Sequence, residues 1–163
     1  MKIAITGHTA GIGKRAFERL APDIIGFSRS NGYDINIFEH RQRIILESAN
    51  CDLFINNAPA GFSQTKMFIE LFKSWQHDPS KTIINVGSRI AEIDQLPTSR
   101  YDLLQYQADK LILKEMSGRV TGQCQVKYRW FGYVGTEAIL KKYPHFTSSD
   151  YITEDQAIDI LLE

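Results

Sequence analysis

Short apolar runs alternate with longer amphipathic stretches along this chain of 163 residues. The short runs are almost continuously apolar, which is typical of parallel strands covered by helices on both faces. The pattern predicts six strands, at residues 2–6, 23–29, 33–35, 51–58 and 81–88 and within 123–134. Apolar residues at helical spacing predict helices at residues 13–20, 40–50, 64–75, 101–116 and 153–162. We therefore expect an α/β fold with three layers, α/β/α, built on a doubly wound parallel sheet of about six strands.

The last predicted helix carries a start signal. Its sequence TEDQ has the capping-box form, with Thr153 as the cap and Gln156 three residues on. No internal repeat, low-complexity stretch or linker interrupts the alternation. We expect a single domain over residues 1–163.

Composition narrows the class of protein. The chain is 43% hydrophobic and 23% charged, which is ordinary for a soluble globular protein, and 19 Lys and Arg balance 19 Asp and Glu. This balance gives no indication of binding to nucleic acid or to an anionic membrane. Cys51 and Cys124 have no CxxC partner, so we expect buried free thiols rather than a disulfide or a zinc site. The first apolar run is too short for a signal peptide, and we expect a cytoplasmic protein.

A glycine cluster, TGHTAGIG, follows the first predicted strand. Where a strand turns into a helix, unpaired N–H groups and the helix dipole favour an anion such as a pyrophosphate. Gly7, Gly11 and Gly13 allow the turn, the close approach of the ligand and tight packing of helix on strand. Their spacing is GxxxGxG rather than GxGxxG, and an ordinary strand-turn-helix connection is the alternative.

The second predicted strand ends in Ser28 and Arg29, where an Asp or Glu would hydrogen-bond the adenosine ribose of NAD. An arginine can instead pair with a 2′-phosphate. The sequence therefore favours NADP(H) over NAD(H) as cofactor. In the alternative interpretation, Arg29 is a solvated loop residue.

Four motifs, the glycine turn among them, resemble those of the short-chain dehydrogenase/reductase family, and they occur in the family's order. They are the glycine turn TGHTAGIG, DLFINNAP at residues 52–59, TIINVGS at residues 82–88 and YQADK at residues 106–110. Asp34 and Ile35 are similar to an acidic-apolar element that follows the family's third strand, and residues 131–136 take the place of its Pro-Gly turn leading to a Thr. The resemblance spans nearly the whole chain and implies a Rossmann-like NAD(P)-binding domain.

The resemblance implies a catalytic set of Ser88, Tyr106 and Lys110. Tyr106 and Lys110 are four residues apart, so they share one helix face, and a nearby ammonium lowers the pKa of a phenol. Tyr106 could then exchange a proton with a carbonyl or an alcohol while the cofactor carries the hydride. The alternative is an amphipathic helix with a solvated lysine.

The resemblance also implies the cofactor-binding residues. Lys110 would hold the nicotinamide ribose in addition to its catalytic role, residues 57–59 would line the adenosine side, and residues 132–136 would contact the carboxamide end. The expected set is Gly7, Thr9, Gly11, Ile12, Gly13, Ser28, Arg29, Asp34, Ile35, Asn57, Ala58, Pro59, Tyr106, Lys110, Gly132, Val134 and Thr136. We expect no metal site.

The chain departs from the family at several positions. The family has a tetrad Asn in the helix after the fourth strand, but no Asn lies between residues 61 and 78. Gln64 is polar, yet we expect it to lie too early in the helix to substitute. Pro59 and Phe131 replace a Gly and a Pro of the family motifs. The chain is shorter than is usual for the family, and its substrate-covering segment is reduced to about residues 137–152.

A reduced cover predicts an open substrate pocket. Candidates for its wall, with core packing as the alternative, are Phe62, Tyr133, Tyr143, Phe146 and Tyr151. We also expect a homodimer or homotetramer through the helices at 64–75 and 101–116. Their apolar residues exceed what one buried stripe needs, namely Met67, Phe68, Leu71, Phe72, Trp75, Leu103, Leu104, Leu111 and Leu113.

The favoured function is NADP(H)-dependent oxidation and reduction of a small-molecule carbonyl or alcohol. A non-catalytic NADP(H)-binding or regulatory protein is the second hypothesis, supported by the missing Asn and the reduced cover. A doubly wound protein that binds another phosphate ester is the third.

Overall fold

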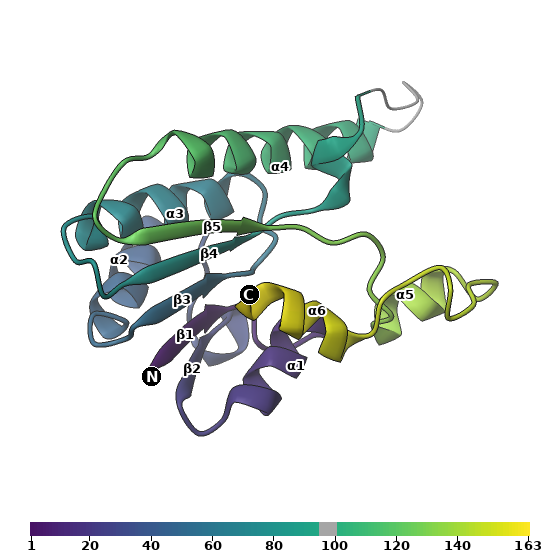
Figure 1. Ribbon diagram of the computed structural model, residues 1–163, viewed down its shortest axis with the longest axis horizontal. Helices are drawn as coiled ribbons and strands as arrows, with labels where there is room; N and C mark the ends of the chain where they lie inside the picture. Colours follow the sequence, from purple (N-terminus) through teal and green to yellow (C-terminus); the bar gives the residue numbers. More distant parts are fainter. Residues whose placement is uncertain (95–100) are drawn as a thin grey trace.

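The computed structural model describes residues 1–94 and 101–163 and contains one parallel sheet (Figure 1). The strands run in the order β2-β1-β3-β4-β5, and every neighbouring pair is parallel. They are β1 (Ile3–Thr6), β2 (Ile24–Phe27), β3 (Leu53–Asn56), β4 (Thr82–Val86) and β5 (Gln125–Arg129). The doubly wound parallel sheet is confirmed, with five strands in place of about six.

The strand predicted at residues 33–35 is wrong. This stretch is a loop between a short 3-10 helix, η1 (Arg29–Asn31), and α2 (Phe38–Glu47). The backbone N–H of Asp34 donates to the ring of His40, and its carboxylate accepts from Asn36. Because these groups bond locally, the stretch adds no strand to the sheet, although Ile35 is buried in the core.

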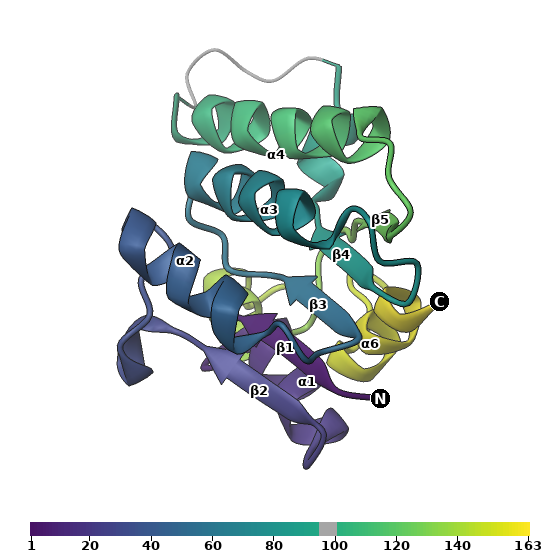
Figure 2. The same cartoon turned by 90° about the vertical axis from the view of Figure 1, so that its left-hand side faces the viewer.

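Helices cover both faces of the sheet (Figures 1 and 2). One layer consists of α2, α3 (Phe62–Trp75) and α4 (Tyr101–Arg119), and the other of α1 (Gly11–Leu20) and α6 (Glu154–Leu162). The five predicted helices are confirmed, with ends that differ by at most three residues. The predicted capping box at the start of α6 is present, because Thr153 accepts from the N–H of Gln156 and Gln156 accepts in return.

The two layers bury alternate residues of each strand. Ala4 and Phe54 lie in the core under α2, α3 and α4, whereas Ile3, Ile5 and Ile55 lie in the core under α1 and α6. This period of two is what a strand with both faces covered requires. It fixes the register of the sheet and therefore the position of every strand end.

The apolar residues of α3 are used within the chain itself. Met67, Phe68, Leu71, Phe72 and Trp75 are at most 8% exposed, and they pack into the core under that helix. They do not form a surplus stripe, so this basis for the predicted homodimer or tetramer is wrong. On α4, Leu113 is also buried, and Leu111 is 39% exposed. The oligomeric state stays a prediction.

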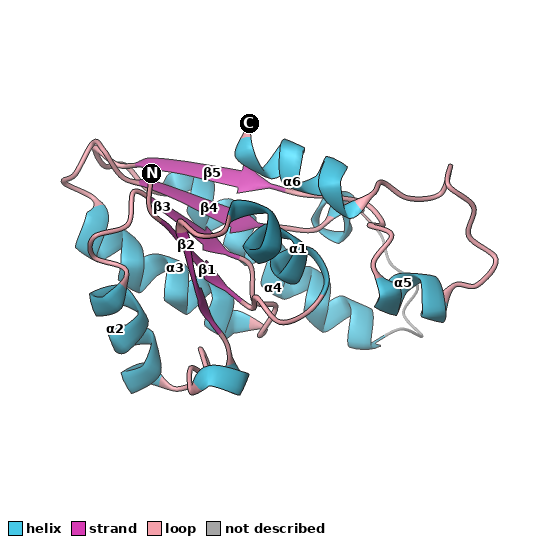
Figure 3. Cartoon of the chain, turned by 90° about the horizontal axis from the view of Figure 1, so that it is seen from below, coloured by secondary structure: helices cyan, strands magenta, loops and turns pink. Residues whose placement is uncertain are grey.

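The order of the strands reverses at β1, which lies between β2 and β3. In doubly wound sheets, ligands bind outside the carboxyl ends of the strands at such a point. The short helix α5 (Glu137–Lys142), which the sequence did not predict, projects beyond this edge (Figure 3).

Candidate functional site

The glycine cluster forms the turn between β1 and α1 at this edge. Gly7 and Gly11 have φ values of 74° and 51°, a region that residues with a side chain rarely adopt. A Cβ atom at Gly13 would lie 2.0 Å from the carbonyl oxygen of Gly7, so helix and turn touch directly. The first turn of α1 has no side-chain cap and no acidic residue. Its N–H groups can therefore donate hydrogen bonds to an anion.

The end of β3 braces this turn. The side-chain hydroxyl of Thr6 accepts from the backbone N–H groups of Asn57 and Ala58, at 3.0 and 3.1 Å. The Asn57 amide donates to the carbonyl oxygens of Thr6 and Gly7, at 3.1 and 3.2 Å. The Asn57 side chain therefore holds the turn, while Ala58 and Pro59 continue along the same edge.

The end of β2 supplies a serine and an arginine. Ser28 is buried, and its Oγ lies 2.7 Å from the Oγ of Ser30. Arg29 is exposed at the start of η1, and no ion pair joins it to any residue in the described part of the chain. Its guanidinium is therefore available to an anionic ligand.

The three predicted catalytic residues lie at the end of β4 and on α4. Ser88 follows β4 and caps a short 3-10 helix, η2 (Arg89–Glu92), by accepting from the N–H of Ile90 at 3.3 Å. Tyr106 is 37% exposed on α4. One turn later, Lys110 is 4% exposed, and its Nζ lies 5.6 Å from the centre of the Tyr106 ring. The shared helix face expected from their spacing is confirmed.

The Lys110 ammonium is held by two acceptors inside the protein. Its Nζ donates to the side-chain oxygen of Gln64 at 2.7 Å and to the carbonyl oxygen of Val86 at 3.0 Å. Burial lowers the pKa of Lys110 to about 8, against a smaller upward effect of Asp109. At neutral pH the ammonium is therefore charged, and a rise of about one pH unit brings it to its pKa.

Gln64 is one residue of this site that the sequence analysis missed. It lies in the first turn of α3, as its position predicts, but its side chain is long enough to reach Lys110 from there. Gln64 therefore contacts Lys110 directly, which the sequence did not predict, and whether it substitutes for the tetrad Asn stays a prediction. The only signal in the sequence was a polar residue at the start of an otherwise apolar helix face.

Tyr128 is a second residue that the sequence analysis missed. It lies on β5, and its ring covers Gly87, where a Cβ atom would be 2.1 Å from the ring. Its Oη is buried and makes no hydrogen bond of normal geometry with the described residues. Burial raises the pKa of Tyr128 to about 12, against a smaller lowering by the backbone N–H of Ser88. A tyrosine hydroxyl therefore lies beneath the Ser88 loop.

The residues predicted to follow β5 lie between that strand and α5. Gly132 is exposed, whereas Val134 and Thr136 are buried. The Thr136 hydroxyl caps α5 by accepting from Ile139, and its methyl group would lie 3.4 Å from a Cβ atom at Gly11. Thr136 therefore lies against the glycine turn.

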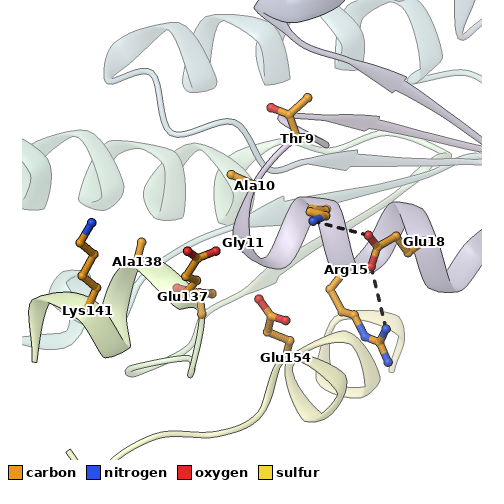
Figure 4. A pocket seen from close by; sticks show the side chains of 11 residues that line it. Thr9, Ala10, Gly11, Arg15, Glu18, Glu137, Ala138, Lys141 and Glu154 are labelled. Atoms are coloured by element: carbon orange, nitrogen blue, oxygen red, sulfur yellow. Dashed lines mark ion pairs between the residues drawn. The ribbon is translucent and has the colours of Figure 1, made fainter. Parts of the chain in front are cut away.

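A cavity of about 410 Å³ opens beside the glycine turn, between α1 and α5 (Figure 4). Thr9, Gly11 and Thr136 line one side of it. Lys14 and Arg15 also line it, and both are paired with Glu18. The three predicted catalytic residues do not line this cavity.

Three of the five aromatic candidates gather in one cluster. The rings of Tyr143 and Phe146 stack 4.8 Å apart, and Tyr133 packs edge-on against Phe146 at 4.8 Å. They join the segment after α5 to the loop that follows β5. Tyr151 covers Gly135 instead, and Phe62 is 48% exposed at the start of α3.

Three solved structures with the same architecture are dehydrogenases. The 3-alpha-hydroxysteroid dehydrogenase from a Pseudomonas species, complexed with NADH, matches with a TM-score of 0.75 and 16% identity over 99% of this chain and 88% of its own. A short chain dehydrogenase from Burkholderia cenocepacia in complex with NADP matches with a TM-score of 0.74 and 18% identity, over 99% and 84%. The chain has the fold of the short-chain dehydrogenases/reductases. The closed form of serine dehydrogenase complexed with NADP+ shares it, with a TM-score of 0.72 and 17% identity over 98% and 87%.

The likeness to short-chain dehydrogenases/reductases is one of fold. Neither a protein-family model nor a curated protein sequence matches this chain. Within residues 1–94 and 101–163, no helix has the length and apolar character needed to cross a bilayer. The same residues contain no group of three or more His, Cys, Asp or Glu arranged to hold a metal ion.

Proposed function

We propose that this protein is a short-chain dehydrogenase/reductase that uses NADP(H) to interconvert a carbonyl and an alcohol. The observation that carries the proposal is the ammonium of Lys110, buried on α4 and facing the ring of Tyr106. A buried lysine is rare because removing its charge from water is costly. Here it lies on the same edge of the sheet as Ser88 and the glycine turn.

The residues at this edge fit a dinucleotide. Gly7 and Gly11 have positive φ values and no side chain, so a ligand can approach the backbone of the turn closely. The start of α1 has no side-chain cap, which leaves its N–H groups available to a pyrophosphate. Arg29, exposed beside Ser28 and without an ion pair to a described residue, suits a 2′-phosphate. Thr136 lies against the glycine turn. The resemblance implies that it contacts the nicotinamide end of the cofactor. The matched dehydrogenases, one complexed with NADH and one with NADP, support a nicotinamide dinucleotide as the ligand.

The side chains divide the proton chemistry among them. Tyr106 Oη donates a proton to the substrate oxygen during reduction and accepts one during oxidation. The Lys110 ammonium, 5.6 Å from the centre of the Tyr106 ring, stabilises the negative charge left on Oη when the proton is transferred. Ser88 Oγ already accepts a bond from Ile90, so its hydrogen remains free to donate to the same substrate oxygen. The nicotinamide, when bound, supplies the carbon that accepts or donates the hydride.

A non-catalytic NADP(H)-binding or regulatory protein is the second candidate. The observation that favours it is the position of the cavity, which opens beside the glycine turn and is not lined by Ser88, Tyr106 or Lys110. A protein of this kind needs the cofactor cradle alone.

Replacing Tyr106 by Phe separates the two candidates. We expect the Tyr106→Phe variant to bind NADPH within about twofold of the wild-type affinity, followed by nicotinamide fluorescence, and to lose about 100-fold or more in turnover on a carbonyl panel. Tyr33→Phe is the matched control, because its hydroxyl bonds Glu47 on α2 and has no role in the proposed reaction. Turnover by Tyr106→Phe at the wild-type rate would remove the proposed mechanism. NADPH binding without turnover by the wild type would favour the second candidate.

A further inference from the structure

A ladder of buried polar side chains runs beneath Lys110. The amide of Asn56 on β3 donates to Asn85 on β4 at 2.8 Å, and Asn85 donates to Ser117 on α4 at 2.9 Å. Asn56 also donates to the backbone oxygen of Gln64 at 2.9 Å. Asn56, Gln64 and Asn85 are at most 2% exposed. Buried amides of this kind fix one arrangement when they are hydrogen-bonded to one another.

Two backbone oxygens fix which way the Gln64 amide points. Its Nε2 donates to the backbone oxygens of Asn56 and Val86, at 2.8 and 3.0 Å. A backbone oxygen can only accept a hydrogen bond. If the amide were flipped, the side-chain oxygen of Gln64 would face these two backbone oxygens with no hydrogen between them. The side-chain oxygen of Gln64 must therefore face Lys110, which it meets at 2.7 Å.

We propose that Gln64 is a positioning residue that holds the Lys110 ammonium against Tyr106. This inference rests on the proposed function. The Lys110 ammonium has three N–H donors. One donates to Gln64 and one to Val86, so the third remains for the side that faces Tyr106, where the proposed cofactor and substrate bind. A lysine has a long stem with many rotamers, and two fixed acceptors select one of them.

The inference gives Gln64 a role that packing alone does not explain. An apolar residue of the same length would fill the same volume, yet it would leave the ammonium with Val86 as its one acceptor among these contacts. The contact is also direct, so Gln64 couples Lys110 to β3 and β4 through the ladder. A charge placed on the side chain at position 64 should therefore change the pKa of Lys110.

The experiment compares three variants of the whole chain. Gln64→Met keeps the length and removes the acceptor, whereas Gln64→Glu keeps the acceptor and adds a negative charge. Both variants lose the Nε2 bonds to the backbone oxygens of Asn56 and Val86, so these losses are common to the pair. Ser117→Ala is the matched control, because it breaks the far end of the ladder and does not contact Lys110. The readouts are the pKa of Lys110, followed by the carbon-13 shift of its Cε in lysine-labelled protein, together with kcat and the NADPH Kd. Asp109, next to Lys110, and Tyr106 are unchanged in all three variants.

The two Gln64 variants should move the pKa of Lys110 in opposite directions. We expect Gln64→Met to lower it, because the charged form loses an acceptor, and Gln64→Glu to raise it. For Gln64→Met, kcat should fall about tenfold to a hundredfold, the range for losing a hydrogen bond to a charged group, with the Kd within about threefold. Ser117→Ala should leave the pKa and kcat near wild type even if the protein is less stable.

The outcomes separate this inference from the proposed function. An equal pKa of Lys110 in Gln64→Met and Gln64→Glu overturns the inference, as does a Gln64→Met kcat equal to that of Ser117→Ala. If the wild type turns over no carbonyl, the proposed function fails. The carbon-13 titration still decides whether Gln64 holds Lys110, because it needs no activity.

Discussion

At the scale of single residues, the buried charge of Lys110 makes stability depend on pH. Its pKa is lowered from 10.5 to about 8 in the folded protein, whereas the unfolded chain keeps the ordinary value. Between these two pH values the unfolded state binds more protons, so this group makes the folded state more stable as the pH rises. Below about pH 8 both states are protonated, the cost of the buried charge is fully present, and the slope from this group vanishes.

We therefore expect the free energy of unfolding of the wild type, relative to Lys110→Met, to increase between about pH 8 and pH 10.5. The increase is at most about 3 kcal/mol, from the size of the pKa shift. Urea unfolding of both proteins at several pH values measures it, and subtracting the variant removes the contributions of the other groups. A difference that is constant from pH 7 to pH 10.5 would show that Lys110 titrates normally.

The residues of this site were predictable where a short motif defines them. The spacing of Tyr106 and Lys110 places both on one helix face, and Ser88 follows from the end of a buried strand. Gln64 was not predictable, because α3 begins two residues earlier than its apolar pattern indicates and because side-chain reach is not visible in a sequence. The hydroxyl of Tyr128 was missed for a related reason, since only the register of β4 and β5 brings it over Gly87.

At the scale of elements, the glycine turn and β2 are coupled by one side chain. The ring of His8 in the turn lies over Gly26 in β2, where a Cβ atom would be 2.3 Å from the ring, and it packs on Phe17 of α1. We expect Gly26→Ala to lower the free energy of unfolding by about 1–3 kcal/mol through overpacking. In a His8→Ala background the same change should cost at least about 1 kcal/mol less, because the ring is absent.

Chemical unfolding of the two single variants and the double variant measures this coupling. Gly118→Ala is the control, because a Cβ atom at this helical glycine of α4 would meet no other described residue within 4 Å beyond its own helix backbone, so alanine should be tolerated or stabilising there. Equal costs of Gly26→Ala with and without His8 would mean that the ring moves aside freely.

Elements were predicted well where apolar periodicity is long, and poorly where local bonding decides. The stretch at residues 33–35 has strand-like residues, but Asp34 and its neighbours bond to one another and to His40 instead of to the sheet. The helix α5 was missed because six residues are too few for apolar residues to recur at helical spacing, and none of them is buried. It begins after Thr136, whose hydroxyl caps it and whose methyl group faces the glycine turn.

At the scale of the whole molecule, the apolar surplus on α3 was interpreted as an interface but proved to be core. A helix that packs against a sheet and against neighbouring helices has a wider apolar face than a helix at the surface. Sequence alone cannot distinguish such a core-facing helix from one that forms an interface with another chain. The proposed cofactor site has the opposite character. It combines the ends of β1 and β2 with the start of α1, so a ligand bound there contacts several elements at once.

Such a ligand should stabilise the whole molecule. With NADPH at about 100 times its Kd, mass action adds about 2.7 kcal/mol to the free energy of unfolding, which a thermal melt detects as a higher Tm. At the same concentration NADH should raise the Tm less, because it has no 2′-phosphate for Arg29.

In Arg29→Ser we expect the effect of NADPH to fall to that of NADH. Arg119→Ser, an exposed arginine at the end of α4, should behave as wild type. Equal shifts by the two cofactors in the wild type would contradict the role given to Arg29 and would leave the glycine turn as the main determinant of binding.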